Sequence, residues 1–168
     1  MSDTELTPET QNAFEAPKAN LSTPVTNNPI LELQRFSAWG VFGLSIITLG
    51  LYFIYWMFTR TKQINMLSKV AKANIVALYI YIGSSVISNI SQYVLDPTNM
   101  VVAIVILIAG VAGIVAYIMT VFSARKALQE VINEGSQEEV KLGGILTFFF
   151  SAIYFQYKIN EAIDNQSE

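Results

Sequence analysis

A row of polar side chains interrupts the otherwise apolar stretch of residues 75–95. Ser85, Asn89 and Gln92 recur at helical spacing, and Ser88 lies beside the same helix face. Hydroxyl and amide groups are costly against hydrocarbon, so we expect this face to point toward protein or a water-filled cavity. The row is then either a polar pathway for a solute or a set of hydrogen bonds between helices.

Small residues form a second pattern, in residues 100–122. Ala109 and Gly113 are four positions apart, and so are Ala112 and Ala116. Such spacing lets the backbone of a neighbouring helix approach closely. The neighbour is either residues 75–95 of the same chain or a second copy in a homo-oligomer, and in both cases the pattern predicts an interface.

The sequence lacks the residue types on which most catalysis depends. It contains no cysteine and no histidine, which removes disulfides, thiolate and imidazole metal ligands, cysteine nucleophiles and histidine bases. The apolar stretches also contain no acid, lysine or arginine to activate the remaining hydroxyl groups. We expect no catalytic residue, no cofactor and no metal site, and we do not expect an enzyme.

Four uncharged stretches must position these side chains: residues 36–58, 75–95, 100–122 and 142–157. As helices, the first three are long enough to cross a hydrocarbon layer of about 30 Å, whereas the fourth is slightly short. The composition, 52% hydrophobic and 14% charged, agrees with a bilayer location.

Between the second and third stretches, Asp96, Pro97, Thr98 and Asn99 provide helix-stop and N-cap chemistry. The sequence therefore predicts an all-α membrane protein. Four hydrophobic helical segments would surround a central antiparallel helical hairpin.

The ends of the chain are polar. Residues 1–35 are rich in Thr, Pro, Asn and Glu, and their prolines are spaced so that no long helix fits. We predict a disordered N-terminal tail over residues 1–35, a helical membrane domain over residues 36–162 and a polar C-terminal tail over residues 163–168.

Charge predicts the orientation of the hairpin. Residues 59–74 carry four bases and no acid, whereas residues 96–99 carry no base. The positive-inside rule then places the first connector on the cytoplasmic side and the turn on the other side. Residues 36–58 and 142–157 either both span or are both re-entrant or interfacial, and residues 48–50 and 143–144 are positions where a helix could break. Only the second of these arrangements places every lysine and arginine of the chain on the cytoplasmic side.

After residue 122 the helix is expected to continue, with Lys126 and Glu130 as an ion pair one turn apart. Four acids then form an acidic patch, for which solvated helix surface is the default interpretation: Glu130, Glu134, Glu138 and Glu139.

A short pattern of Leu or Ile, Tyr, Phe, any residue and Tyr occurs at residues 51–55 and 153–157, with Asn65 and Asn160 following. It indicates either a duplicated element or the usual clustering of aromatic residues at membrane interfaces. The first copy and its surroundings resemble the motif of a bacterial membrane family, domain of unknown function 4234. Six residues carry the resemblance: Thr48, Gly50, Tyr52, Tyr55, Trp56 and Asn65.

The resemblance implies a small multi-pass protein of the bacterial cytoplasmic (inner) membrane whose activity is not established, and no site residue can be carried over from it. We expect such a chain to act through contacts with the lipid bilayer, a membrane-protein partner or a second copy of itself. The alternative is a small-solute channel or transporter subunit that uses the polar face of residues 75–95. Nucleic acid is not an expected partner, because the sequence provides no dense basic surface.

Overall fold

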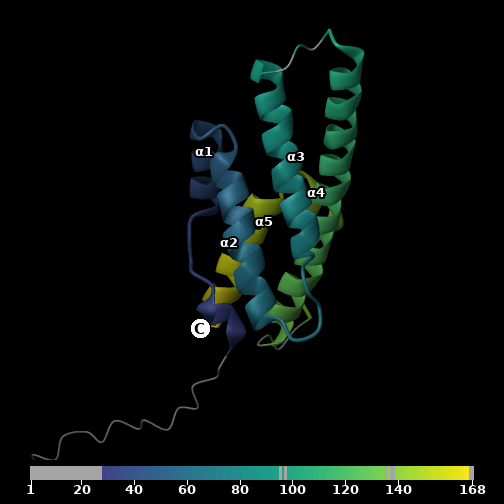
Figure 1. Ribbon diagram of the computed structural model, residues 1–168. Helices are drawn as coiled ribbons and strands as arrows, with labels where there is room; N and C mark the ends of the chain where they lie inside the picture. Colours follow the sequence, from purple (N-terminus) through teal and green to yellow (C-terminus); the bar gives the residue numbers. More distant parts are fainter. Residues whose placement is uncertain (1–27, 95, 97, 135, 137–138, 167–168) are drawn as a thin grey trace, which may run out of the picture.

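The computed structural model describes residues 28–94, 96, 98–134, 136 and 139–166. This part of the chain is helical, without strands (Figure 1). It comprises a 3₁₀ helix and five α-helices in the order η1 (Pro29–Glu32), α1 (Ala38–Ile47), α2 (Leu51–Leu67), α3 (Ile75–Val94), α4 (Met100–Glu134) and α5 (Gly144–Asp164).

The predicted antiparallel hairpin is present as α3 and α4: α3 packs against the first part of α4, and α4 continues beyond it (Figure 1). The turn between them is closed by local side chains. One carboxylate oxygen of Asp96 accepts hydrogen bonds from the backbone N–H and the hydroxyl of Thr98, and Asn99 accepts from the N–H of Val101 at 3.0 Å. Asn99 thus caps α4 in the manner that its residue type predicts.

In the described part of the chain, α4 is the one helix that is both long and apolar enough to cross a membrane. It has 35 residues, and its end at Glu134 confirms the helical continuation that was expected after residue 122. In its most apolar stretch of 18 residues, 11% of the residues are buried. The side chains that remain exposed along α4 include Val101, Val105, Ile108, Val111 and Val115.

Residues 36–58, predicted as one apolar segment, are not one helix, and the structure contains the break considered at residues 48–50. α1 ends at Ile47, and the chain reverses into α2 (Figure 1). Leu49 and Gly50 have φ angles of +52° and +89°, a region that glycine adopts without strain. With 10 residues, α1 is about 15 Å long, half of a hydrocarbon layer.

The fourth segment also differs from its prediction. α5 begins at Gly144 and continues to Asp164, so it includes Lys158 and the first residues of the predicted C-terminal tail. The two copies of the aromatic pattern therefore lie in different settings. Residues 51–55 begin a helix after a turn, whereas residues 153–157 lie in the middle of a continuous helix.

The predicted polar tail ends earlier than residue 35. Asn28 accepts a hydrogen bond from the N–H of Ile30 and begins η1. Ile30 and Leu33 are buried in the core, because the helices leave an apolar site that these two side chains fill. Residues 28–35 are thus part of the fold, and residues 1–27 lie outside the described residues.

The molecule is unequal at its two ends. The α3–α4 turn lies at one end, and the connectors α2–α3 and α4–α5, η1 and the end of α5 lie at the other (Figure 1). We call the latter the connector end. Much of the buried core belongs to the second halves of α2, α4 and α5, which lead to it, with Ile64, Leu128, Val131, Phe155 and Ile159 among its members. Toward the α3–α4 turn, apolar side chains are mostly exposed.

Candidate functional site

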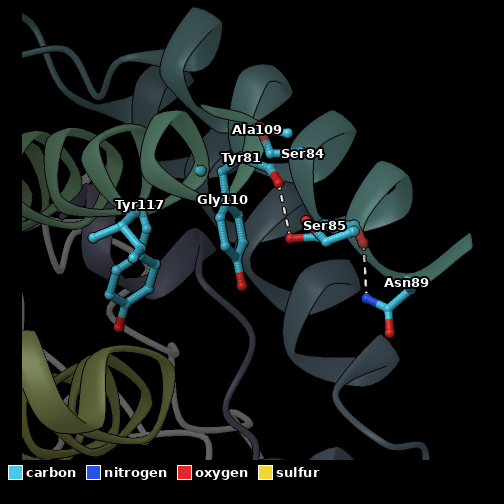
Figure 2. A pocket seen from close by; sticks show the side chains of 10 residues that line it. Tyr81, Ser84, Ser85, Asn89, Ala109, Gly110 and Tyr117 are labelled. Atoms are coloured by element: carbon cyan, nitrogen blue, oxygen red, sulfur yellow. Dashed lines mark hydrogen bonds between the residues drawn. The ribbon is translucent and has the colours of Figure 1, made fainter. Parts of the chain in front are cut away.

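The polar side of α3 borders a groove between α4 and the tip of the α1–α2 hairpin. A cavity of about 380 Å³ lies between α3 and α4, and its lining includes Ser84, Ser85, Ser88, Asn89, Ala109, Gly110 and Gly113 (Figure 2). A second cavity, of about 400 Å³, lies between α3 and residues 49–54. Tyr81, Ser85 and Asn89 border both cavities. We refer to these two adjoining cavities as the polar groove.

Of the eight residues singled out in the polar row and the small-residue pattern, five border this groove, and Ala112 and Ala116 of α4 do not. Ser85, Ser88 and Asn89 come from α3, and Ala109 and Gly113 come from α4. Gln92 lies in α3, but its side chain is outside the described part of the structure. The polar residues of α3 and the small residues of α4 therefore form two walls of the same groove.

Hydrogen bonds within α3 satisfy part of its polar row. The Ser85 hydroxyl donates to the carbonyl of Tyr81 at 2.8 Å, and the Asn89 amide donates to the carbonyl of Ser85 at 2.7 Å (Figure 2). Ser91 donates in the same way to Ser88. Such bonds to the preceding turn satisfy part of the hydrogen-bonding capacity of polar side chains in an apolar setting.

Gly113 sets the distance between the two walls. A Cβ atom built at Gly113 would lie 2.9 Å from the Cβ of Ser84. Ser84 is 8% exposed. The small-residue pattern of α4 is therefore used against α3 of the same chain, which is one of the two partners that the sequence allowed.

Two tyrosines form the floor of the groove, and the sequence patterns did not identify either. The rings of Tyr81 and Tyr117 are 5.4 Å apart between centroids. The Tyr117 hydroxyl donates to the carbonyl of Phe148 at 3.0 Å and lies 3.2 Å from the hydroxyl of Ser151. The sequence feature that could have identified Tyr117 is its position as a tyrosine within the aliphatic residues 100–122. Tyr117 also borders a third cavity, of about 310 Å³, under the α1–α2 tip.

The lining limits the chemistry of the groove. It presents hydroxyl and amide groups beside small and apolar side chains, and none of the described residues that border the two cavities is acidic or basic. Such a lining suits uncharged groups that form hydrogen bonds, and it provides no evident proton acceptor for general base catalysis. Within the described residues, no group of three acids gathers to hold a metal ion.

The motif residues of the resemblance build the α1–α2 hairpin. The Thr48 hydroxyl donates to the carbonyl of Leu44 at 2.7 Å and accepts from the N–H of Tyr52 at 2.9 Å, so it joins the end of α1 to the beginning of α2. Gly50 supplies the left-handed turn between them. These two residues therefore determine where the chain reverses.

The aromatic motif residues fix the hairpin to the rest of the fold. Trp56 is 3% exposed, and its indole N–H donates to the side-chain oxygen of Gln156 at 3.1 Å. The ring of Tyr52 lies against those of Phe36 and Tyr55. Trp56 thus joins α2 to α5, whereas Tyr55 is exposed.

Asn65, the last motif residue, holds an extended segment of the chain. Its amide donates to the carbonyl of Ala73 at 2.9 Å, and its oxygen accepts from the N–H of Ala73 at 2.7 Å. Asn133 makes the same pair of bonds with Val140, and Asn160 makes it with Phe36. Each asparagine lies near the end of a helix and orients the segment that leads to another helix.

The acidic patch predicted around the end of α4 is divided among separate contacts. Glu130 accepts hydrogen bonds from the backbone N–H groups of Lys69, Val70 and Ala71 and from the hydroxyl of Ser68. Glu134 forms an ion pair with Lys69. Glu139 lies 3.6 Å from Lys141. Glu138 lies outside the described residues.

The predicted ion pair of Lys126 and Glu130 is absent from the described part of the chain. The Glu130 carboxylate is turned toward the α2–α3 connector instead. Burial acts most strongly on this group and would raise the pKa of Glu130. The hydrogen bonds from Val70, Ala71, Lys69 and Ser68 together outweigh burial and lower the pKa below its ordinary value.

The fold and the groove define a helical protein built on an apolar hairpin, one helix of which is long and apolar enough to cross a membrane. Residues 36–165 match the family described as Domain of unknown function (DUF4234), and the chain belongs to this family. The match includes all five α-helices. Neither the curated proteins nor the solved structures provide a match.

Proposed function

We propose that this chain is an integral membrane protein whose α3–α4 hairpin crosses the bilayer. The observation that carries the proposal is the exposed apolar surface of α4, on which Leu107, Ile108 and Ile114 each expose more than 60% of their area. Water-soluble proteins rarely leave so continuous an apolar surface uncovered. The core helix of a soluble protein would instead be mostly buried, whereas 11% of the most apolar stretch of α4 is buried.

The shape of the α1–α2 hairpin supports re-entry. α1 is half as long as a crossing helix, and α2 returns the chain to the connector end. The lysines and arginines of the described residues belong to the connectors or to the helix halves that lead to that end. By the positive-inside rule, the connector end is then cytoplasmic. Together with the family resemblance, this favours the cytoplasmic membrane of a bacterium.

Cysteines introduced singly at Thr98, Val70 and Asn165 test this arrangement. All three positions are exposed. In intact cells, a membrane-impermeant maleimide is expected to label the cysteine at Thr98 only. The cysteines at Val70 and Asn165 should be labelled only after the membrane is opened, because both lie at the connector end. The protein should also resist extraction by alkaline carbonate.

The labelling result at each position tests one part of the proposed arrangement. Labelling of Asn165→Cys in intact cells would mean that α5 crosses the bilayer and would contradict the re-entrant arrangement. Equal labelling of Thr98→Cys and Val70→Cys would contradict the crossing of α3 and α4. Release of the chain by carbonate would contradict the membrane location itself.

Within the membrane, we propose a function through contact with lipid or with another membrane protein, and no catalysis. The support is the combination of a broad apolar surface with a groove that has no acid or base in its lining. Purification in a mild detergent, followed by identification of the proteins and lipids that remain bound, tests this role. A protein that retains neither would contradict it.

The polar groove favours a second candidate function, passage of a small uncharged solute. Asn89 borders both cavities of the groove, and its amide donates to the carbonyl of Ser85. If the groove conducts, Asn89→Leu should lower glycerol flux into proteoliposomes, while Ile87→Leu, at an exposed position of α3 that borders neither cavity, leaves it unchanged. Shrinkage and reswelling followed by light scattering measures the flux. Wild-type protein without flux above empty liposomes would exclude this candidate.

A further inference from the structure

A separate cavity, of about 380 Å³, lies where the apolar part of α4 gives way to its polar extension. The α2–α3 connector, the beginning of α3 and one face of α4 border it, and it shares no lining residue with the polar groove. Its lining includes Lys72, Asn74, Met119, Phe122, Ser123 and Lys126. Two lysines therefore meet two large apolar side chains at one level of the molecule.

The two lysines leave positive charge at the cavity. Lys126 is exposed and has no carboxylate within 4.0 Å among the described residues, since Glu130 is held by the connector. The Lys72 ammonium donates to the main-chain oxygens of Asn65 and Ser68. These oxygens bear no formal charge, so neither lysine is neutralised by an acid.

Asn74 adds a neutral donor. Its side-chain oxygen accepts from the N–H of Ala77 at 2.9 Å, and its amide N–H₂ forms no hydrogen bond in the described part of the chain. Ser123 is already used, because its hydroxyl accepts from the N–H of Asn74 and donates to the carbonyl of Thr120. The cavity thus offers ammonium and amide donors, and no acidic side chain borders it. This chemistry matches a phosphate group.

The apolar side of the cavity continues toward the bilayer. Met119 is 51% exposed, and Val115, one turn nearer the α3–α4 turn, is also 51% exposed. An acyl chain extending from the cavity would lie along these side chains, with its headgroup at the level of Lys126. Free phosphate would leave Met119 and Phe122 without a role.

We propose that this cavity binds an anionic phospholipid, with the phosphate between Lys126 and Lys72 and the acyl chains along α4. The inference rests on the proposed membrane location and names one lipid class and one site for it. A basic pocket at a cytoplasmic interface is a setting in which anionic headgroups bind.

Full-length protein in an uncharged detergent tests the site, with dihexanoyl phosphatidylglycerol as the probe. Dihexanoyl phosphatidylcholine and inorganic phosphate serve as comparison ligands. Thermal unfolding is followed by the fluorescence of Trp39 and Trp56. The Tm is expected to rise saturably with phosphatidylglycerol. Lys126→Gln should raise the lipid concentration at half-effect about fivefold, which corresponds to about 1 kcal/mol for one lysine.

Lys62→Gln is the matched control, because Lys62 is exposed, lies over the ring of Phe58 and does not border the cavity. It removes the same charge and should leave the half-effect concentration unchanged. Lys72 is not substituted, since its ammonium also holds the end of α2.

Three results would overturn the inference: an equal weakening by Lys62→Gln, an equal Tm rise with phosphatidylcholine, or an equal rise with inorganic phosphate alone. Each variant is first extracted with alkaline carbonate. A chain that remains in the membrane but does not respond to phosphatidylglycerol contradicts this site only, whereas a chain released by carbonate contradicts the proposed function.

Discussion

Replacing Gly113 with leucine is expected to lower the free energy of unfolding by about 2–3 kcal/mol, because the side chain would force α3 and α4 apart. The first added atom already lies 2.9 Å from the Cβ of Ser84. Both Cβ atoms are fixed to helix backbones, so rotation of a side chain cannot relieve the overlap. The helices must separate, and that change disturbs the wall of the polar groove.

Alanine at the same position isolates the steric effect. Gly110 lies nearly one turn earlier in α4, and a Cβ built there would meet no atom within 4 Å. Because alanine favours a helix over glycine by up to about 1 kcal/mol, Gly110→Ala should leave the Tm unchanged or raise it. Gly113→Ala should lower the Tm in the same detergent. Equal Tm values for the two alanine variants would contradict the close approach of the helices at Gly113.

The α3–α4 hairpin was predictable because its determinants are local. Asp96 and Asn99 act within three residues of their own positions, and the apolar runs on either side are long enough to identify without knowledge of their partners. The break in residues 36–58 was considered but not decided. Thr48 and Gly50 identify where a turn can form, but the contact that holds the returning helix against the fold joins Trp56 to Gln156, which are 100 positions apart.

Helical periodicity identified both walls of the polar groove, since Asn89 and Gly113 lie on faces that the spacing of residues defines. The same patterns did not identify the two tyrosines that form the floor of the groove. Tyr117 reaches α5 through its hydroxyl, and no sequence spacing connects Tyr117 with Phe148. The burial of residues 28–35 was missed for a related reason, because Ile30 and Leu33 fill a site formed by helices distant in the sequence.

The asparagines and Glu130 illustrate a further limit. Asn65 was identified as part of a motif, but its role depends on an extended segment that follows α2. For Glu130, the spacing favoured Lys126, whereas the structure offers four donors from residues about 60 positions away. The spacing of residues within one helix cannot show that Glu130 prefers these distant donors to Lys126, which lies one turn away.

Glu130→Ala is expected to destabilise the connector end by about 2 kcal/mol. Hydrogen bonds to a charged group contribute about 1.5–3 kcal/mol each, and we discount their sum because the carboxylate is partly exposed. The backbone N–H groups of Lys69, Val70 and Ala71 would lose their acceptor, so the α2–α3 connector should exchange its amide hydrogens faster. Hydrogen exchange with mass spectrometry measures this locally. Glu139→Ala removes an exposed acid whose ion pair, within the described residues, is with the exposed Lys141, and it should change neither quantity.

Acid should reproduce the loss. The pKa of Glu130 is lower in the folded chain than its ordinary value of 4.5, because the hydrogen bonds outweigh the opposing effect of burial. A carboxylate of this kind stabilises the fold fully above the pKa of the unfolded chain and loses that contribution as the pH falls through the folded pKa. Wild-type Tm should therefore decline below about pH 4.5 more steeply than that of Glu130→Ala, and Glu139→Ala should follow the wild type. Parallel declines in all three proteins would mean that the connector does not depend on the Glu130 carboxylate.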